Sequence, residues 1–227
     1  MLYAVLTRCV AGLGRAWFRL SVVGADRVPR EGRLLLAANH VSVLDPALIG
    51  AVLPRELDFL AKTELFDIPG FGALIRRLNA HPVDRSGSDS TALRLALRLL
   101  GDGRAVLVFP EGTRGTEGRL GPARAGAGML AALSEAPVVP VYVQGSGRAL
   151  PRGAIVPRPA RVTVTFGGPP LRFARERGKA RYQEISDEIM AAIGRVKTEA
   201  ERGHPAAAED TRTDPTTPGR APAGRIH

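Results

Sequence analysis

The chain has 227 residues and carries 32 Lys and Arg against 22 Asp and Glu, a formal net charge of +10. This length predicts one large domain with short appendages, and 44% hydrophobic residues suffice for a core, which excludes a wholly disordered chain. The single cysteine, Cys9, excludes an intrachain disulfide and a zinc site built from several cysteines. A chain with this positive charge is attracted to anionic membranes, nucleic acid or phosphorylated substrates. Its aromatic residues make up only 5%, which disfavours a surface that binds single-stranded nucleic acid by stacking.

Residues 1–20 are predicted to form an amphipathic helix. The apolar residues that recur at helical spacing are Leu2, Val5, Leu6, Cys9, Val10, Leu13, Trp17 and Leu20, and the residues on the other side include Arg8, Arg15 and Arg19. The helix can lie in a membrane interface or pack on the domain as an ordinary helix. We favour the membrane, because the cationic side contains no acid. No uncharged apolar run reaches the roughly 18–20 residues that span a bilayer, so we expect peripheral binding at the cytoplasmic face.

Strand-like and helix-like segments alternate through the rest of the chain, which predicts a layered α/β fold with a mostly parallel β-sheet flanked by helices. The predicted strands are residues 33–39, 57–61, 80–83, 105–109, 138–143 and 161–166, the last of them half-buried. The predicted helices are residues 46–52, 69–78, 91–100, 126–133 and 179–200. We therefore divide the chain into the N-terminal helix (1–20), one domain (21–202) and a disordered tail (203–227) whose prolines interrupt any apolar periodicity.

The first candidate site is the segment Asn39–Pro46, which directly follows a buried strand, where ligands bind in open α/β sheets. His40 and Asp45 would not meet on one continuous helix, but they can meet if His40 lies in the strand-to-helix turn. The carboxylate would then orient the imidazole and raise its basicity. The alternative is a loop histidine followed by a helix start, with Asp45 as N-cap and Pro46 at the first helical position.

The second candidate site is the segment Phe109–Arg114, at the exit of another buried strand. Gly112 permits a tight turn or the close approach of a ligand, and Arg114 with backbone N–H groups can hold a phosphate. The alternative is a surface turn in which Glu111 and Arg114 form an exposed ion pair.

Three further basic residues occupy loops beside predicted strands or helices. Lys62 and Arg85 each follow a short strand, and Arg124 precedes a helix. Singly, each is explained as a solvated loop residue. Together with Arg114 they would place positive charge around the histidine and its carboxylate.

These motifs resemble those of the glycerolipid acyltransferases of the 1-acylglycerol-3-phosphate acyltransferase type. The family motif NHxSxxDP matches Asn39–Pro46, and FPEGTR is present unchanged at Phe109–Arg114. A V-D-R motif matches residues 83–85, and V-P-V matches residues 139–141. The resemblance covers about residues 20–170, with the motifs in the family's order.

The resemblance implies a role for each site residue. His40 would be the general base and Asp45 its partner. The residues implied to bind the acceptor phosphate are Arg85, Glu111, Gly112, Thr113, Arg114, Lys62 and Arg124. Arg124 departs from the family, which usually has lysine there. No metal or cofactor is implied; acyl-CoA or acyl carrier protein would be the co-substrate.

The implied reaction moves a fatty acyl group to 1-acylglycerol-3-phosphate and gives phosphatidic acid, with membrane lipid as partner and no nucleic acid. The acceptor could instead be another lysophospholipid or a lyso-aminolipid. A non-enzymatic basic membrane- or nucleic-acid-binding protein is the second alternative, and the motif order argues against it. A serine hydrolase is the third, and it lacks a G-x-S-x-G elbow: Gly145-Ser146-Gly147 has the wrong spacing.

Overall fold

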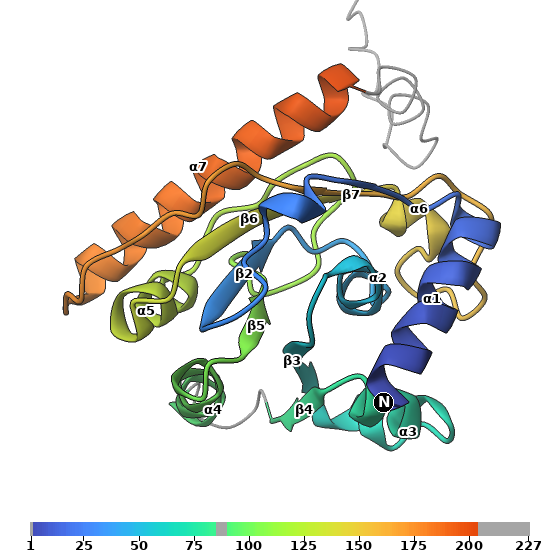
Figure 1. Cartoon of the computed structure of the whole chain (residues 1–227), viewed down its shortest axis with the longest axis horizontal. Helices are drawn as coiled ribbons and strands as arrows, with labels where there is room; N and C mark the ends of the chain where they lie inside the picture. The colour runs from blue at the N-terminus through green and yellow to red at the C-terminus, as the bar shows by residue number, and fades with distance from the viewer. Residues whose placement is uncertain (1, 85–89, 204–227) are drawn as a thin grey trace, which may run out of the picture.

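The structure is a computed structural model that describes residues 2–84 and 90–203. Its centre is a seven-stranded sheet in the order β1-β7-β6-β2-β5-β3-β4 (Figure 1). The strands are β1 (Ser21–Val23), β2 (Leu34–Ala38), β3 (Leu57–Lys62), β4 (Ala80–Val83), β5 (Ala105–Val108), β6 (Val138–Gln144) and β7 (Thr163–Phe166). The helices are α1 (Leu2–Phe18), α2 (Asp45–Val52), α3 (Phe71–Arg77), α4 (Ser90–Gly101), α5 (Ala125–Ser134), α6 (Ser146–Ala149) and α7 (Lys179–Gly203).

The five strands from β2 to β6 run parallel, and only β7, antiparallel to β6, and β1, parallel to β7, run the other way. The predicted mostly parallel sheet is therefore confirmed. The central parallel strands β2 and β6 are buried on both faces, which accounts for continuous apolar runs such as Leu34–Ala38.

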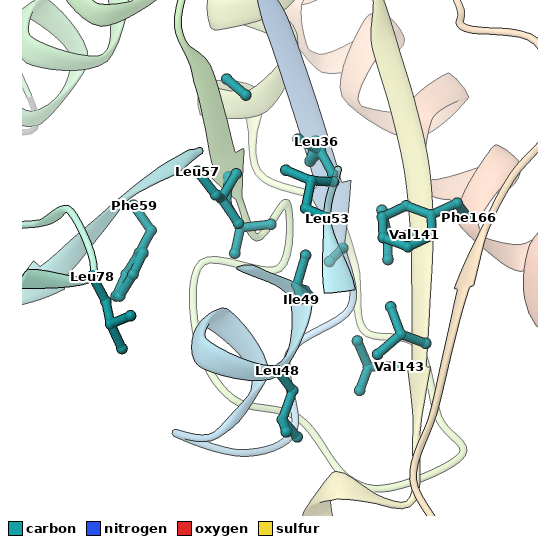
Figure 2. Close-up of a cluster of buried hydrophobic side chains, with 14 of the residues drawn as sticks. Leu36, Leu48, Ile49, Leu53, Leu57, Phe59, Leu78, Val141, Val143 and Phe166 are labelled. Atoms are coloured by element: carbon teal, nitrogen blue, oxygen red, sulfur yellow. The ribbon is translucent and has the colours of Figure 1, made fainter. Parts of the chain in front are cut away.

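Two hydrophobic cores lie on opposite faces of the sheet. One core contains residues of α1, α2 and α3, and the other contains residues of α4, α5 and α7. Figure 2 shows the first core, in which Leu48 and Ile49 of α2 lie among Leu36 of β2, Leu57 of β3 and Val143 of β6. In the second core Ile185, Ile189, Ile193 and Val196 of α7 are buried, as their helical spacing predicts.

The connections after β2 and β5 leave the sheet on opposite faces. The chain passes from β2 into α2 on one face, and from β5 into α5 on the other. Because β2 and β5 are neighbours, their connections diverge at one point of the sheet, and the carboxyl ends of strands at such a point are where ligands bind in sheets of this type. Asn39–Pro46 and Phe109–Arg114 both lie at this point.

Helix α1 packs against α2 through a face different from the one its apolar residues suggest. Its buried residues are Thr7, Ala11, Gly14 and Phe18, which are mostly small and allow close approach. Leu2, Val5, Leu13 and Trp17 instead point outward and are more than half exposed. The helix therefore packs on the domain and also presents an exposed apolar stripe, while its contact with a membrane stays a prediction. No helix in the described ranges is long and apolar enough to cross a membrane.

The structure departs from the prediction in several elements. The strand expected at 161–166 spans Thr163–Phe166 and is wholly buried, because β1 covers the edge that would otherwise be open. The sequence did not predict β1 or α6, which have three and four residues and no measurable periodicity. Residues 203–227, the predicted tail, lie outside the described residues except for Gly203, which ends α7.

Candidate active site

Asn39 ties the end of β2 to the neighbouring strand β6. Its side-chain Nδ2 donates to the carbonyl oxygen of Val143 at 2.9 Å, and its Oδ1 accepts from the N–H of Val143 at 2.7 Å. The side chain is buried, so this paired contact satisfies both ends of the amide. The turn that follows Asn39 therefore starts from a fixed point.

His40 and Asp45 meet at the strand-to-helix turn. The imidazole Nδ1 lies 2.9 Å from Oδ2 of Asp45, whose side chain is fully buried. The same Oδ2 accepts from the backbone N–H groups of Val41 at 2.8 Å and Ser42 at 2.9 Å. The other oxygen, Oδ1, accepts from the hydroxyl of Ser146 at 2.5 Å. The carboxylate is thus surrounded by donors.

This arrangement determines which histidine nitrogen is available for chemistry. Since Asp45 acts as an acceptor, Nδ1 of His40 carries a proton, and Nε2 is left with a lone pair. The imidazole also stacks on Phe109, with ring centroids 3.9 Å apart and planes 16° apart. Phe109 therefore fixes the plane of the ring while Asp45 fixes its rotation.

Helix α2 begins at Asp45, but Asp45 is not its N-cap. The N-cap position is Leu44, and Pro46 lies in the first turn. The Asp45 carboxylate turns back to the preceding residues instead of capping the helix. The alternative of an N-cap aspartate beside an unrelated loop histidine is therefore wrong, because both side chains belong to one hydrogen-bonded turn.

Glu111 joins the two motif loops from a buried position. Its Oε1 accepts from the backbone N–H of His40 at 3.2 Å, and its Oε2 accepts from that of Gly121 at 3.1 Å. The N–H of Gly115 in turn donates to the carbonyl of His40 at 2.7 Å. Glu111 thus holds the histidine loop, while its predicted membership in a phosphate site stays a prediction.

Gly112 and Arg124 lie against each other. Gly112 has φ +69° and closes a tight turn, as predicted for this glycine. A Cβ at Gly112 would lie 2.7 Å from Cδ of Arg124, so the arginine side chain covers this turn. The backbone of Arg124 is held by its N–H to Pro110 at 2.8 Å and by Ser186 of α7, which donates to its carbonyl at 2.8 Å.

The remaining predicted phosphate residues are distributed around the same edge of the sheet. Thr113 is exposed and Arg114 is half-buried, both beyond the Gly112 turn. Lys62 is the exposed last residue of β3, and it pairs in register with Val83 of β4. Arg85 lies outside the described residues.

The sequence did not single out two residues that support Asp45. Glu117 accepts from the N–H groups of Gly145 at 2.8 Å and Gly147 at 2.9 Å. Between these glycines lies Ser146, which is fully buried and donates to Asp45. Burial raises the pKa of the Glu117 carboxyl, against the effect of those two N–H groups and of Arg148. The signal in the sequence was the position of Gly145–Gly147, directly after the apolar run of β6.

Side chains suited to a metal ion do not gather in threes anywhere in residues 2–84 and 90–203. The site is instead built from one imidazole, three carboxylates held by donors (Asp45, Glu111 and Glu117), and arginines. Such a set can accept a proton and hold an anion.

A family model described as Acyltransferase matches residues 19–144, more than half of the chain, so the chain belongs to this family. The resemblance drawn from the motifs is therefore confirmed.

Individual relatives agree with this assignment. The 1-acyl-sn-glycerol-3-phosphate acyltransferase of Bacillus subtilis is 31% identical over 134 residues, which cover 58% of this chain and 66% of that protein. The chloroplastic enzyme LPAT1 of Arabidopsis thaliana is 31% identical over 61% of this chain and 39% of its own length. The chain thus aligns with less than two thirds of each of these relatives.

A solved structure shows the same fold. The crystal structure of the 1-acyl-sn-glycerophosphate (LPA) acyltransferase PlsC from Thermotoga maritima superposes with a TM-score of 0.66 and 26% identity. The match covers 83% of this chain and 77% of that one.

Proposed function

We propose that the protein transfers a fatty acyl group from acyl-CoA or acyl carrier protein to the free hydroxyl of 1-acylglycerol-3-phosphate and yields phosphatidic acid. The observation that carries this proposal is the His40–Asp45 pair, held at 2.9 Å in the turn that follows β2, beside the end of β5. The relatives that share the fold are named for this reaction.

The chemistry needs one base and no covalent enzyme intermediate. Nε2 of His40 accepts the proton of the acceptor hydroxyl as its oxygen attacks the thioester carbonyl. The tetrahedral intermediate then collapses, the carbon–sulfur bond breaks, and the imidazolium returns the proton to the leaving thiolate. Asp45 stabilises the imidazolium and keeps Nδ1 protonated throughout. Ser146 is fully buried and donates to Asp45, which argues against its use as a nucleophile.

The acceptor phosphate is proposed to bind along the loops after β5 and β3. Arg114 and Arg124 supply guanidinium groups that match a phosphate with two parallel hydrogen bonds. Arg124 lies directly over the Gly112 turn, which supports one site formed by Arg124 and the Phe109–Arg114 loop. Lys62, Thr113, Gly112 and Arg85 are proposed to complete it. Binding the phosphate there would orient the hydroxyl toward His40.

The lipid acceptor requires contact with a membrane, and we propose that this contact is peripheral and on the cytoplasmic side. The exposed stripe of α1, with Leu13 at 69% and Trp17 at 54% exposure, supports it. The exposed Arg8 and Arg15 lie beside this stripe, where they can meet anionic headgroups.

The experiment that tests the proposal follows free thiol while the purified protein is incubated with lysophosphatidic acid and a long-chain acyl-CoA. We expect thiol release that depends on the acceptor, with phosphatidic acid as the product by mass spectrometry. A parallel series replaces acyl-CoA by acyl carrier protein, and the acceptor by other lysophospholipids, a lyso-aminolipid or a monoacylglycerol. Release with none of these acceptors would overturn the proposal, and preference for another acceptor would change the substrate but keep the reaction.

A further inference from the structure

We propose that residues 151–161, the loop between α6 and β7, form a second membrane contact that inserts Ile155 and Val156 into the interface of an anionic bilayer. This inference rests on the proposed function, since a lipid acceptor brings the active site to a membrane. It adds a contact that lies beside the active site and is separate from the exposed stripe of α1.

The apex of the loop presents apolar side chains to solvent. Ile155 is 92% exposed and Val156 is 74% exposed, more than any other large apolar side chain in the described ranges. Both are β-branched residues without any contact to the core, so their exposure contributes nothing to folding. Adjacent exposed apolar side chains are typical of surfaces that meet a membrane or another protein.

The loop is held at its base, which keeps the apex in place. The N–H of Arg158 donates to the carbonyl of Ala149 at 2.7 Å, and the N–H of Ala154 donates to that of Pro151 at 3.0 Å. Leu150 and Val162, the residues that flank the loop, are both buried. A loop fixed in this way can insert its tip without a large ordering cost.

The charge of the loop favours an anionic bilayer over a protein partner. Arg152, Arg158 and Arg161 are all exposed, and the chain has no Asp or Glu between Glu135 and Glu176. Apolar side chains flanked by arginines are the pattern of an interfacial membrane contact, in which the arginines meet lipid phosphates.

The position of the loop connects it both to α1 and to the catalytic turn. The N–H of Val162 donates to the carbonyl of Phe18 at 2.9 Å, so the loop ends beside the end of α1, as Figure 1 also shows. The hydroxyl of Ser42 donates to the carbonyl of Leu150 at 3.1 Å. The N–H of Ser42 also donates to Asp45. Ser42 therefore links the His40–Asp45 turn to Leu150, the residue that precedes the loop.

Fluorescence of the full chain tests the two contacts separately. The chain has a single tryptophan, Trp17, which reports on α1. A variant that combines Trp17→Phe with Ile155→Trp reports on the loop. With vesicles of phosphatidylcholine and phosphatidylglycerol, we expect a blue shift and quenching by brominated lipids at both positions. A response at Trp17 with none at position 155 would overturn the proposed loop contact and leave the acyl transfer, measured on the same vesicles, unaffected.

Vesicle flotation then measures what the loop contributes. Removing both side chains with Ile155→Ser and Val156→Ser is expected to weaken vesicle binding by about tenfold or more, because two aliphatic side chains leave the membrane. Arg152→Gln with Arg158→Gln is expected to weaken binding to anionic vesicles and not to pure phosphatidylcholine. The matched control is Arg94→Gln with Arg98→Gln, which removes the same charge from exposed positions of α4 on the opposite face of the sheet.

The variants also separate a membrane from nucleic acid. Unchanged vesicle binding in the Ile155→Ser, Val156→Ser variant would contradict the proposal. A second result would also contradict the proposal: the Arg152→Gln, Arg158→Gln variant loses binding to duplex DNA but keeps its binding to vesicles. These arginines would then bind a nucleic acid and not lipid phosphates.

Discussion

Nδ1 of His40 lies 2.9 Å from Oδ2 of Asp45, and that oxygen also accepts the N–H groups of Val41 and Ser42. One carboxylate oxygen therefore sets both the fold of the turn and the tautomer of the imidazole. The other oxygen accepts from Ser146, so both ends of the side chain are acceptors, whereas an amide has a donor at one end and carries no negative charge.

Asp45→Asn is therefore expected to lower kcat for acyl transfer by about 10²–10⁴-fold, because a neutral amide does not stabilise the imidazolium as the carboxylate does. The KM values should change much less. The free energy of unfolding should also fall by about 1–3 kcal/mol, since the amide puts a donor at a buried position where the carboxylate accepts. Steady-state kinetics measure kcat and KM, and denaturant unfolding of the same preparation measures the free energy of unfolding. Wild-type kcat in a folded variant would contradict the account.

Ser146→Ala removes the hydroxyl that holds the second oxygen of Asp45. We expect kcat to fall by roughly tenfold with little change in KM, because the aspartate loses orientation but keeps its contact with His40. The matched control is Ser21→Ala, which removes a side-chain hydrogen bond to Thr163 at the far edge of the sheet. Equal losses of kcat in the two variants would indicate a general effect on stability instead of a positioning role.

Arg114→Ala and Arg124→Ala are each expected to raise KM for lysophosphatidic acid by about tenfold, since each removes a charge-assisted contact to phosphate. KM for the acyl thioester should stay near its wild-type value. Arg→Lys at the same positions should recover part of the loss, because charge remains and the bidentate geometry does not. Arg119→Ala, an exposed neighbour, is the control. An equal effect on a monoacylglycerol, which has no phosphate, would exclude these arginines from the phosphate site.

Glu117→Gln should alter how stability depends on pH. Because burial raises the folded-state pKa of Glu117 above its usual value of 4.5, the folded protein binds the proton more tightly than the unfolded chain. That stabilisation is present below the usual pKa and is lost as pH rises through the raised one. Relative to wild type, Glu117→Gln is therefore expected to gain stability as pH rises through this interval. Denaturant unfolding of both proteins at several pH values measures the difference, and a constant or opposite trend would contradict the prediction.

Gly128 lets α5 and α7 approach each other closely. A Cβ there would lie 2.8 Å from the backbone nitrogen of Ser186 and closer still to the carbonyl of Tyr182. Gly128→Ala should therefore destabilise the fold by about 1–3 kcal/mol. Gly194→Ala is the matched control in α7, where the nearest atom is 3.8 Å away, and it should stabilise slightly through helix propensity. Thermal unfolding distinguishes the two, and an equal effect would show that the helix contact tolerates a methyl group.

The parallel core of the fold could be predicted because it repeats a simple pattern. Buried strands such as Ala105–Val108 alternate with helical segments along the chain. This alternation is typical of a parallel sheet whose faces are covered by helices. The orientation of α1 could not be predicted in this way. Its inward face is made of small residues such as Ala11 and Gly14, and its larger apolar residues point outward, so hydrophobicity alone does not identify the face that packs on the domain.

The candidate site also contains residues that the sequence could predict and residues that it could not. His40, Asp45 and Phe109–Arg114 could be found because they are compact motifs directly after buried strands. Ser146 and Glu117 could not, because Ser146 bonds Asp45 across 101 positions of the chain and Glu117 acts through the N–H groups of Gly145 and Gly147. Glu111 was found by motif, but its contacts with backbone N–H groups of two loops depend on the tertiary fold.

The central claim is that His40 is the base that activates the acceptor hydroxyl. Its most direct test compares His40→Ala with wild type in acceptor-dependent thiol release, with the fold of the variant confirmed by circular dichroism. The account predicts a loss of about 10²–10⁴-fold in kcat with binding of lysophosphatidic acid retained. A folded His40→Ala variant that releases thiol at the wild-type rate would contradict it.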